Sequence, residues 1–294
     1  MSVTAALRGV TVPLVTPFAD DAIGWDAYDA LLDHVVDDVD AVFPCGTTGE
    51  FASLSREERH ALVAHTVDRV GDRVAVVAGG GTSDVPDTLS WLEGVADLGV
   101  DAGVVTAPFF HGPNDDAGLT SFFIELADRS PLPLVLYNIP SCVGTSLDPS
   151  LVVELAEHDA IIGFKDSGGN LADDLAVLDR TPDHFLVLPG IDPLVLPAVR
   201  MGAPGCVSAM ANVVPGAYAD LVSRPESDRA RTIHREVIQP LFDNCVEYGF
   251  APATKAALVL TGVLDSPAVR PPLVPTEPAT VAGDVERARA VLGP

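Results

Sequence analysis

The strongest constraint on the fold is a regular alternation of two kinds of apolar segment along most of the chain. Short runs rich in Val, Ile and Leu alternate with amphipathic segments of helical spacing. Continuous apolar runs are typical of strands buried on both faces of a parallel sheet. The eight expected strands are Val10–Val15, Ala41–Pro44, Val74–Ala78, Ala102–Thr106, Leu134–Tyr137, Ile161–Phe164, Phe185–Leu188 and Gly205–Ser208.

An amphipathic segment follows each strand, and most of these segments begin at residue types that cap helices. Eight strand–helix units predict an α/β protein with a (β/α)8 TIM barrel. An open doubly wound sheet is the alternative, but the first strand lacks a GxGxxG turn. The expected helices are Asp26–Val39, Ser55–Val70, Asp84–Leu98, Asp116–Arg129, Asp148–Glu157, Asn170–Leu178, Asp192–Arg200 and Pro215–Ser223.

Three more helical segments follow the eighth unit, at Arg229–Tyr248, Ala251–Gly262 and Val281–Leu292. The proline-rich stretch Pro267–Pro278 is expected to be an extended connector. We therefore expect a catalytic barrel domain over residues 1–225 and a C-terminal helical extension over residues 226–294.

The charge of the chain excludes several partners. It has 42 Asp and Glu against 17 Lys and Arg, a formal net charge of −25. This charge opposes binding to nucleic acid or to an anionic membrane surface. No apolar run is long enough to span a membrane, and the N-terminus does not resemble a signal peptide. The excess of aspartate and the scarcity of lysine indicate adaptation to high salt, where repulsion between carboxylates is screened.

The four cysteines, Cys45, Cys142, Cys206 and Cys245, are widely scattered and show no zinc-binding spacing. We expect reduced thiols, a cytoplasmic location and no metal site.

Only two residues of the chain are lysines, and one of them stands where a TIM barrel performs its chemistry. Lys165 directly follows the apolar run Ile161–Phe164, at the carboxyl end of the sixth expected strand. A buried amine that loses its proton is a nucleophile toward carbonyl groups, although a buried carboxylate could instead neutralise it. Lys255 falls in a helical segment outside the barrel and is expected to be a partly buried structural or surface residue.

Two other strand ends carry polar motifs. Gly46-Thr47-Thr48-Gly49-Glu50 follows the second strand, and its glycines allow consecutive amides to point at one anion such as a carboxylate. A plain strand–helix turn is the alternative. Tyr137, in Tyr137-Asn138-Ile139-Pro140, could move a proton at the barrel mouth or be a core aromatic residue.

With these motifs, the chain resembles the dihydrodipicolinate synthase / N-acetylneuraminate lyase family of pyruvate-dependent class I aldolases. The resemblance spans about residues 7 to 292. The matching segments are Pro13-Leu14-Val15-Thr16-Pro17-Phe18, Gly46-Thr47-Thr48-Gly49-Glu50, Ala107-Pro108-Phe109-Phe110, Tyr137-Asn138-Ile139-Pro140, Gly163-Phe164-Lys165-Asp166, Gly190 with Asp192, and Arg270-Pro271-Pro272.

The resemblance implies a mechanism. Lys165 would form a Schiff base with the keto carbon of pyruvate, so that no separate cofactor is required. The amides of Thr47 and Thr48, with the Thr48 hydroxyl, would hold the pyruvate carboxylate. Tyr137 would be the acid/base for the new alcohol or aldehyde oxygen. The catalytic residues implied are thus Lys165, Tyr137 and Thr48.

Departures from the family pattern bear on the substrate. Cys142 occupies the position where the synthases carry an arginine for the carboxylate of aspartate semialdehyde, and a thiol cannot replace a bidentate cation. Ser167 and Asp192 could instead hydrogen bond the hydroxyls of a sugar acid. Gly190 and Val207 would line the pyruvate pocket through backbone groups. These residues favour cleavage of 2-keto-3-deoxygluconate, or its 6-phosphate, to pyruvate and glyceraldehyde or its 3-phosphate, as in a modified Entner–Doudoroff pathway.

Other members of the family remain alternatives. A synthase would condense pyruvate with aspartate semialdehyde, and a keto-deoxy-glucarate dehydratase would also fit. The family relay of Thr, Tyr and Tyr is interrupted between Thr48 and Tyr137, because Phe109 and Phe110 stand where a neighbouring subunit usually donates a Tyr. A phosphorylated substrate needs a cation, and His111 is the one candidate in that loop. The family also implies a homotetramer, a dimer of dimers. A non-catalytic pyruvate or sugar-acid sensor is disfavoured by Lys165.

Overall fold

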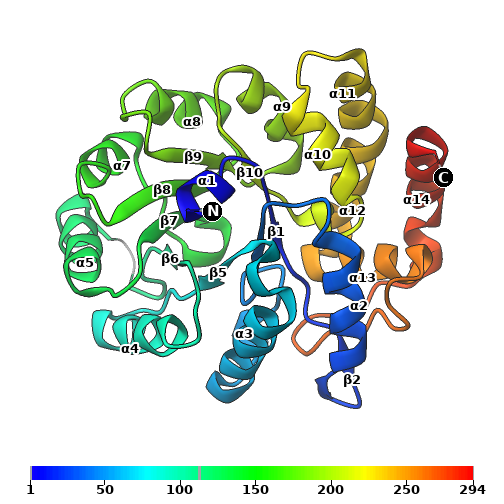
Figure 1. The fold of residues 1–294 in the computed structure, drawn as a ribbon, viewed down its shortest axis with the longest axis horizontal. Helices are drawn as coiled ribbons and strands as arrows, with labels where there is room; N and C mark the ends of the chain where they lie inside the picture. Colours follow the sequence, from blue (N-terminus) through cyan, green and yellow to red (C-terminus); the bar gives the residue numbers. More distant parts are fainter. Residues whose placement is uncertain (1, 112–113, 294) are drawn as a thin grey trace.

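The protein is described by a computed structural model that covers residues 2–111 and 114–293. Eight parallel strands form a nearly closed barrel with helices around it (Figure 1), which confirms the expected TIM barrel. Their order around the barrel is β10-β1-β4-β5-β6-β7-β8-β9, and β9 and β10 meet at the seam. The strands are β1 Val10–Pro13, β4 Ala41–Phe43, β5 Ala75–Gly79, β6 Ala102–Thr106, β7 Leu134–Asn138, β8 Ile161–Asp166, β9 Leu186–Pro189 and β10 Cys206–Val207.

Helices follow the strands as the amphipathic pattern predicts. Ser55 and Glu58 form the expected capping box, and Asp84 and Asn170 cap the N-termini of α4 and α8. The barrel helices are α2 Trp25–Val35, α3 Arg56–Val70, α4 Val85–Ala96, α5 Asp116–Arg129, α7 Pro149–Leu155, α8 Leu171–Leu178, α9 Asp192–Arg200 and α10 Pro215–Ser223. Four single-turn segments accompany them: α6 Pro140–Val143, η1 Phe51–Ser53, η2 Gly71–Arg73 and η3 Ala209–Asn212.

The core has two layers, one between strands and helices and one inside the barrel. The inner layer includes Phe43, Val77, Val104 and Val135, which come from neighbouring strands. Helix α1, Val3–Ala6, precedes β1 and lies across the ring of strands in Figure 1. Because Leu7, next to α1, belongs to the inner layer, this segment closes the N-terminal end of the barrel and leaves the opposite end for chemistry.

Two features differ from the sequence-based expectation. A short hairpin, β2 Phe18–Ala19 and β3 Ala22–Ile23, interrupts the path from β1 to α2. Two residues are too few to show a strand period, so the pattern could not reveal it. Strand β8 also continues to Asp166, beyond the expected end at Phe164. Lys165 therefore lies inside a strand, where its side-chain direction is fixed by the sheet.

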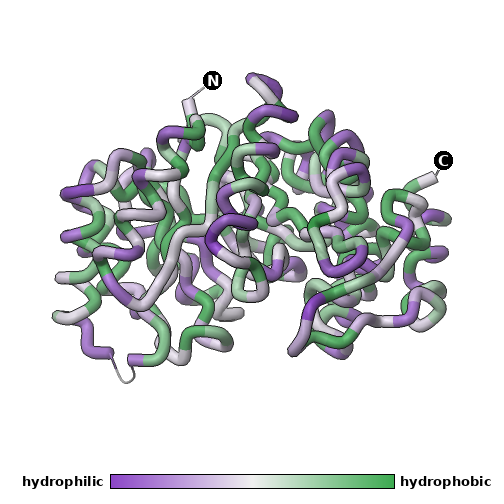
Figure 2. Tube along the Cα trace, turned by 90° about the horizontal axis from the view of Figure 1, so that it is seen from below, coloured by the Kyte–Doolittle hydropathy of each residue, from purple (hydrophilic) through white to green (hydrophobic). Residues whose placement is uncertain are grey.

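The helices of the C-terminal extension pack against one another beside the barrel (Figure 1). The expected helix Arg229–Tyr248 is a continuous run of α11 Asp228–Ile233, a π-helical turn η4 His234–Ile238, and α12 Gln239–Tyr248. It is followed by α13 Phe250–Thr261 and α14 Pro278–Leu292. The chain between α13 and α14 has no regular structure, as the proline-rich composition predicts. Figure 2 shows hydrophilic segments mainly at the outside of both parts.

Candidate active site

Strand register brings the two reactive side chains together. Tyr137 on β7 pairs with Lys165 on β8, and Lys165 pairs with Leu188 on β9. Residues paired in register on neighbouring parallel strands point to the same face, which here is the barrel interior. The Lys165 Nζ lies 3.7 Å from the centre of the Tyr137 ring and 5.2 Å from that of Phe43. The amine therefore sits in an aromatic cradle at the carboxyl end of the strands.

Lys165 is buried and unpaired. Its side chain is 4% exposed, and within residues 2–111 and 114–293 no carboxylate or carbonyl accepts a hydrogen bond from its Nζ. The alternative of a neutralising carboxylate finds no direct ion pair in the described part of the chain, although the buried Asp192 is near enough for its charge to interact with that of Lys165. An amine without a carboxylate or carbonyl partner is free to reach a carbonyl carbon in the pocket and attack it.

Tyr137 is held by the second strand-end loop. Its hydroxyl lies 3.3 Å from the Thr47 Oγ1, while the ring is buried between Lys165 and the barrel wall. The sequence assigns the catalytic hydroxyl of this loop to Thr48, but the hydroxyl in contact with Tyr137 is that of Thr47. The difference follows from the turn, which faces successive side chains in different directions.

The loop between β4 and η1 is shaped as an anion site. The amides of Thr47 and Thr48 donate no hydrogen bond to any described residue, and both residues line the same pocket as Lys165. Two residues that flank the loop, Cys45 and Glu50, have φ of 58° and 57°, in the left-handed region that non-glycine residues seldom adopt. Such strain persists where the surroundings impose it, often at functional sites. Free amides facing one pocket can bind a carboxylate.

Glycine at position 190 makes room for the lysine. A Cβ there would lie 3.2 Å from the Lys165 Cε and 2.4 Å from the Ser167 Oγ. The Gly190 amide donates a hydrogen bond to the Asp166 carbonyl at 2.6 Å. Ser167, Gly190 and Val207 all line the pocket, so these three substrate-binding candidates are gathered around the amine.

Asp192 does not line this pocket. It is fully buried at the start of α9, where its Oδ1 accepts hydrogen bonds from the Tyr218 hydroxyl at 2.5 Å and from the Met210 amide at 3.1 Å. Burial raises the pKa of Asp192, while Tyr218, Met210 and the nearby charge of Lys165 oppose this shift. The carboxylate thus lies behind the pocket wall, and the structure does not place it where it could accept from a substrate hydroxyl.

Two buried carboxyl groups, those of Asp166 and Asp174, lie near the end of β8. Asp166 accepts hydrogen bonds from the Asn138 amide nitrogen at 2.5 Å and from the Gly168 amide at 3.0 Å. The buried carboxyl of Asp174 on α8 lies close enough for its charge and that of Asp166 to interact. Burial, followed by the charge of Asp166, raises the pKa of Asp174 to about 8. Asp174 therefore keeps its proton at neutral pH, a feature that the sequence analysis did not anticipate.

Lys255, the other lysine, is buried in an ion pair. The sequence favours a partly buried or surface position for Lys255, but the structure buries it completely, in an ion pair with Glu50. Its Nζ also donates to the Ala268 carbonyl at 2.7 Å. The scarcity of lysine was the available signal in the sequence, because a lysine that is retained in such a chain is expected to have a special environment.

The pocket around Lys165 is small, about 70 Å³, and Lys165 is the one cationic residue that lines it. The lining residues are Pro13, Thr47, Thr48, Tyr137, Ile139, Ser141, Lys165, Ser167, Gly190, Ile191, Val207, Ala209 and Phe250. Phe250 is the first residue of α13, so the C-terminal extension supplies part of the wall. A pocket of this size suits a small organic acid.

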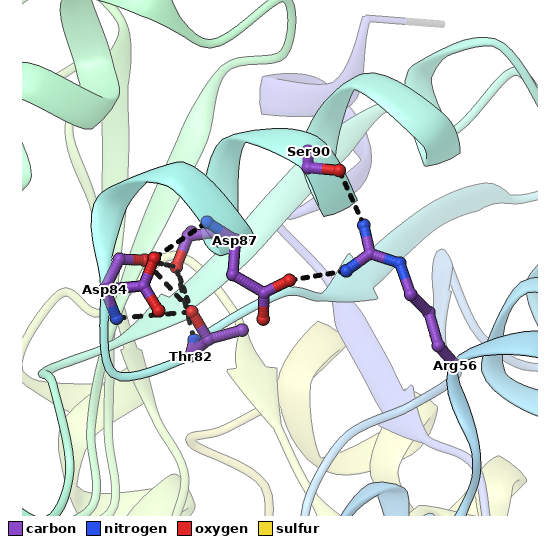
Figure 3. A network of polar contacts seen from close by, with 6 residues as sticks. Arg56, Thr82, Asp84, Asp87 and Ser90 are labelled. Carbon is purple, nitrogen blue, oxygen red and sulfur yellow. Dashed lines mark hydrogen bonds and ion pairs between the residues drawn. The ribbon is translucent and has the colours of Figure 1, made fainter.

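A larger cavity of about 600 Å³ adjoins the pocket and shares Thr47 and Ile139 with it. Cys142 and Arg59 also line this cavity. Asp87, which lines this cavity, accepts a hydrogen bond from Arg56, and Arg56 also donates to Ser90 (Figure 3). At the start of α4, the Thr82 hydroxyl donates to the Asp84 carbonyl.

Among its described residues, 107–111 and 114–115, the loop after β6 has no hydroxyl side chain. Phe109 lines the larger cavity, while Phe110 is 97% exposed with φ of 74°. No group of His, Cys, Asp and Glu residues that could hold a metal occurs within the described ranges. The same ranges contain no helix that is long and apolar enough to cross a membrane.

Comparison with known proteins identifies the family. The model of the dihydrodipicolinate synthetase family matches residues 6–282. The chain belongs to this family. It is 36% identical over 277 residues to the 4-hydroxy-tetrahydrodipicolinate synthase of Thermomicrobium roseum. The matched region covers 93% of this chain and 91% of that protein. Members of the dihydrodipicolinate synthetase family are pyruvate-dependent class I aldolases, a group of carbon–carbon lyases, so the expected enzyme class is confirmed.

Solved structures of the same family agree. The 4-hydroxy-tetrahydrodipicolinate synthase of Methylacidiphilum fumariolicum SolV matches with a TM-score of 0.90 at 30% identity, over 97% of this chain and 96% of that chain. The dihydrodipicolinate synthase of Acinetobacter baumannii, complexed with pyruvate, matches with a TM-score of 0.90 at 26% identity, over 97% and 98%. The names of these relatives correspond to the synthase, the alternative weighed from the sequence, and not to the sugar-acid aldolase.

Proposed function

We propose that this enzyme forms a Schiff base between Lys165 and pyruvate, and that its aldehyde partner is uncharged at the end distant from the reacting carbon. The substrate cleaved is then a 2-keto-3-deoxy sugar acid such as 2-keto-3-deoxygluconate. The observation that carries the proposal is the composition of the pocket: one buried, unpaired amine, two free amides, and no second cation among the lining residues.

The reaction follows from these positions. The carboxylate of the keto acid binds the amides of Thr47 and Thr48, which directs the keto carbon towards the Lys165 Nζ. The amine attacks that carbon and water leaves, so that a protonated imine results. Tyr137 then removes the proton from the hydroxyl on C4, and the C3–C4 bond breaks with its electrons entering the imine. Glyceraldehyde leaves, the enamine takes up a proton, and hydrolysis releases pyruvate.

The Thr47 hydroxyl supports the proton transfer through its contact with Tyr137. This arrangement needs no bound cofactor beyond the lysine itself. It also replaces part of the relay that the family builds with a second tyrosine, because one hydroxyl of the chain's own loop reaches Tyr137 directly.

A second candidate, condensation of pyruvate with aspartate semialdehyde, is supported by the names of the relatives. Cys142 weighs against it, since aspartate semialdehyde carries a carboxylate and a thiol lines the adjoining cavity at the position where the synthases carry an arginine. Arg59 lines the adjoining cavity without an ion pair among the described residues, so a phosphorylated sugar acid is tested as well.

Two measurements test the proposal. Borohydride reduction in the presence of pyruvate is expected to leave a pyruvate-derived mass on Lys165, and absence of that adduct contradicts Schiff-base chemistry. Release of pyruvate from 2-keto-3-deoxygluconate and from its 6-phosphate is then followed with lactate dehydrogenase. Turnover of aspartate semialdehyde with pyruvate, and of neither sugar acid, would establish the second candidate instead.

A further inference from the structure

The buried ion pair between Glu50 and Lys255 joins two parts of the chain that are 205 residues apart. Glu50 is the last residue of the Gly46–Glu50 loop, and its amide donates to the Thr47 carbonyl at 3.1 Å. Lys255 lies on α13 of the C-terminal extension. Both side chains are completely inaccessible to solvent. The contact therefore ties the backbone of the candidate anion loop to a helix outside the barrel.

Every polar atom of the pair has a partner. One Glu50 oxygen accepts from the Lys255 Nζ, and the other accepts from the Arg270 amide at 3.1 Å. The lysine also donates to the Ala268 carbonyl and stands 4.3 Å from the centre of the Phe18 ring. The two oxygens of Glu50 are thus held from α13 and from the segment that follows it, so the carboxylate has one well-defined position.

Stability does not account for this arrangement. A buried ion pair often contributes no more to folding than apolar residues of the same volume, because both charges lose their hydration. Glu50 also keeps a φ of 57°, a backbone conformation that costs energy for a residue with a Cβ. The same residue ends the loop whose Thr47 and Thr48 line the pocket of Lys165, so the pair bears on the geometry of that loop.

We infer that Lys255 is a positioning residue for pyruvate binding: its ammonium holds Glu50, and Glu50 holds the Thr47 and Thr48 amides towards the carboxylate of the keto acid. The inference rests on the proposed function, in which that carboxylate binds these amides. Lys255 itself touches no substrate, because it is absent from the pocket lining. Phe250, at the start of the same helix, does line the pocket, so α13 contributes both wall and anchor.

The test compares two ketones that react with the same lysine. Pyruvate uses the loop amides and acetone, which has no carboxylate, does not. The rate of borohydride trapping on Lys165 is measured against the concentration of each ketone in the full-length protein. The variants are Lys255→Met, Glu50→Gln, and the double variant that removes both charges. Arg56→Gln is the matched control, because it removes an exposed cation from α3 close to the same loop without contacting Glu50.

In folded Lys255→Met, the trapping efficiency with pyruvate should fall about tenfold to a hundredfold, as expected when a bound reactant is displaced by about 1 Å. Trapping with acetone should stay within about twofold of the native rate, since a purely local change at the loop leaves Lys165 intact. Arg56→Gln should behave as the native protein with both ketones. A lysine that matters for general stability alone would lower both efficiencies together.

Equal trapping of pyruvate by the native protein and the variants overturns the inference, and so does a parallel loss with both ketones. If Lys255→Met does not fold, the same ratio is read from Glu50→Gln, whose amide oxygen still accepts from the lysine, and from the double variant, which leaves no unpaired charge. Failure of the native protein to trap pyruvate is a different result, because it contradicts the proposed function and not the role of Lys255.

Discussion

The two lysines of this chain have different roles because they have different partners. Lys165 and Lys255 are both buried, at 4% and 0% exposure. Lys255 is matched by the Glu50 carboxylate, whereas Lys165 faces aromatic rings and a pocket. A lysine paired with a carboxylate holds two segments together, while an amine without an ion partner is available to a carbonyl carbon.

This contrast predicts the outcome of replacing each lysine. Lys165→Met should reduce turnover by at least about a thousandfold while folding normally, because the removed amine leaves no buried partner unsatisfied. Lys255→Met should cost about 3–5 kcal/mol of unfolding free energy, since it strands the Glu50 carboxylate. Urea denaturation and a pyruvate-release assay measure the two effects. Severe unfolding of Lys165→Met would mean that this lysine is structural.

Substrate choice should depend on position 142. Cys142→Arg places a guanidinium in the larger cavity that adjoins the pocket, where a bidentate contact to the carboxylate of aspartate semialdehyde becomes possible. Relative to the native protein, the variant should gain about tenfold or more in kcat/KM for condensation of that aldehyde with pyruvate, equivalent to about 1.4 kcal/mol. Cys142→Ser is the control that changes the thiol without adding charge. An unchanged ratio between aldehydes would show that this position does not select the substrate.

At the scale of strands and helices, the sequence predicts most boundaries because burial and capping are local signals. Ala102–Thr106 and Asp116–Arg129 match the structure at both ends. The sequence did not predict the hairpin β2–β3, because its turn depends on Asp20 and Asp21 at positive φ and its strands have two residues each. Neither feature produces a periodicity that a sequence can reveal.

The candidate site was predictable where it depends on strand ends and not where it depends on distant contacts. The position of Lys165 beside Tyr137 follows from two neighbouring strands of the barrel. The contact of Glu50 with Lys255 brings together residues of two separate regions, and nothing in either segment specifies the other. The burial of Asp192 against Tyr218 could not be foreseen for the same reason.

The carboxyl pair at the end of β8 predicts an unusual dependence of stability on pH. Burial raises the pKa of Asp174 to about 8 in the folded state, above the ordinary value in the unfolded chain. Between these values the folded state binds a proton that the unfolded state has released. The contribution of this carboxyl to stability is therefore complete below about pH 4 and is lost as the pH rises through about 8.

Asp174→Asn should remove this dependence, because an amide keeps a donor for Asp166 without the acid proton. At pH 8 the variant should melt about 4 °C above the native protein, equivalent to about 1–2 kcal/mol for a chain of this size, and near pH 4 the difference should vanish. Calorimetry at both pH values measures it. Asp179→Asn, at the exposed C-terminal end of the same helix, is the control and should leave the difference near zero. A variant less stable than the native protein at pH 8 would contradict the raised pKa of Asp174 in the folded state.

At the scale of the whole molecule, the extension of residues 226–294 is part of the site. Phe250 lines the pocket and Lys255 anchors the anion loop, although both follow the last barrel helix. The barrel alone would lack a wall and the partner of Glu50. Division of the chain into a catalytic barrel and an appendage therefore describes its topology better than its chemistry.

The net charge of −25 predicts that salt stabilises the whole molecule. Carboxylates repel one another over the surface, and the Debye length falls from about 10 Å at 0.1 M to about 3 Å at 1 M ionic strength. Between 0.1 and 2 M KCl at pH 7, the melting temperature should rise by at least about 5 °C, equivalent to about 1–2 kcal/mol.

Screening of charge can be separated from general exclusion of solute by repeating the KCl series near pH 4.3, the isoelectric point. There the carboxylates are largely neutralised or balanced, so the repulsion that salt relieves is absent and the increase in melting temperature should shrink to less than half. Glucose at matched osmolality should give a small increase that is equal at both pH values, because exclusion of a neutral solute does not depend on protein charge. A melting temperature at pH 7 that falls or stays constant up to 2 M KCl would refute adaptation of this acidic surface to high salt.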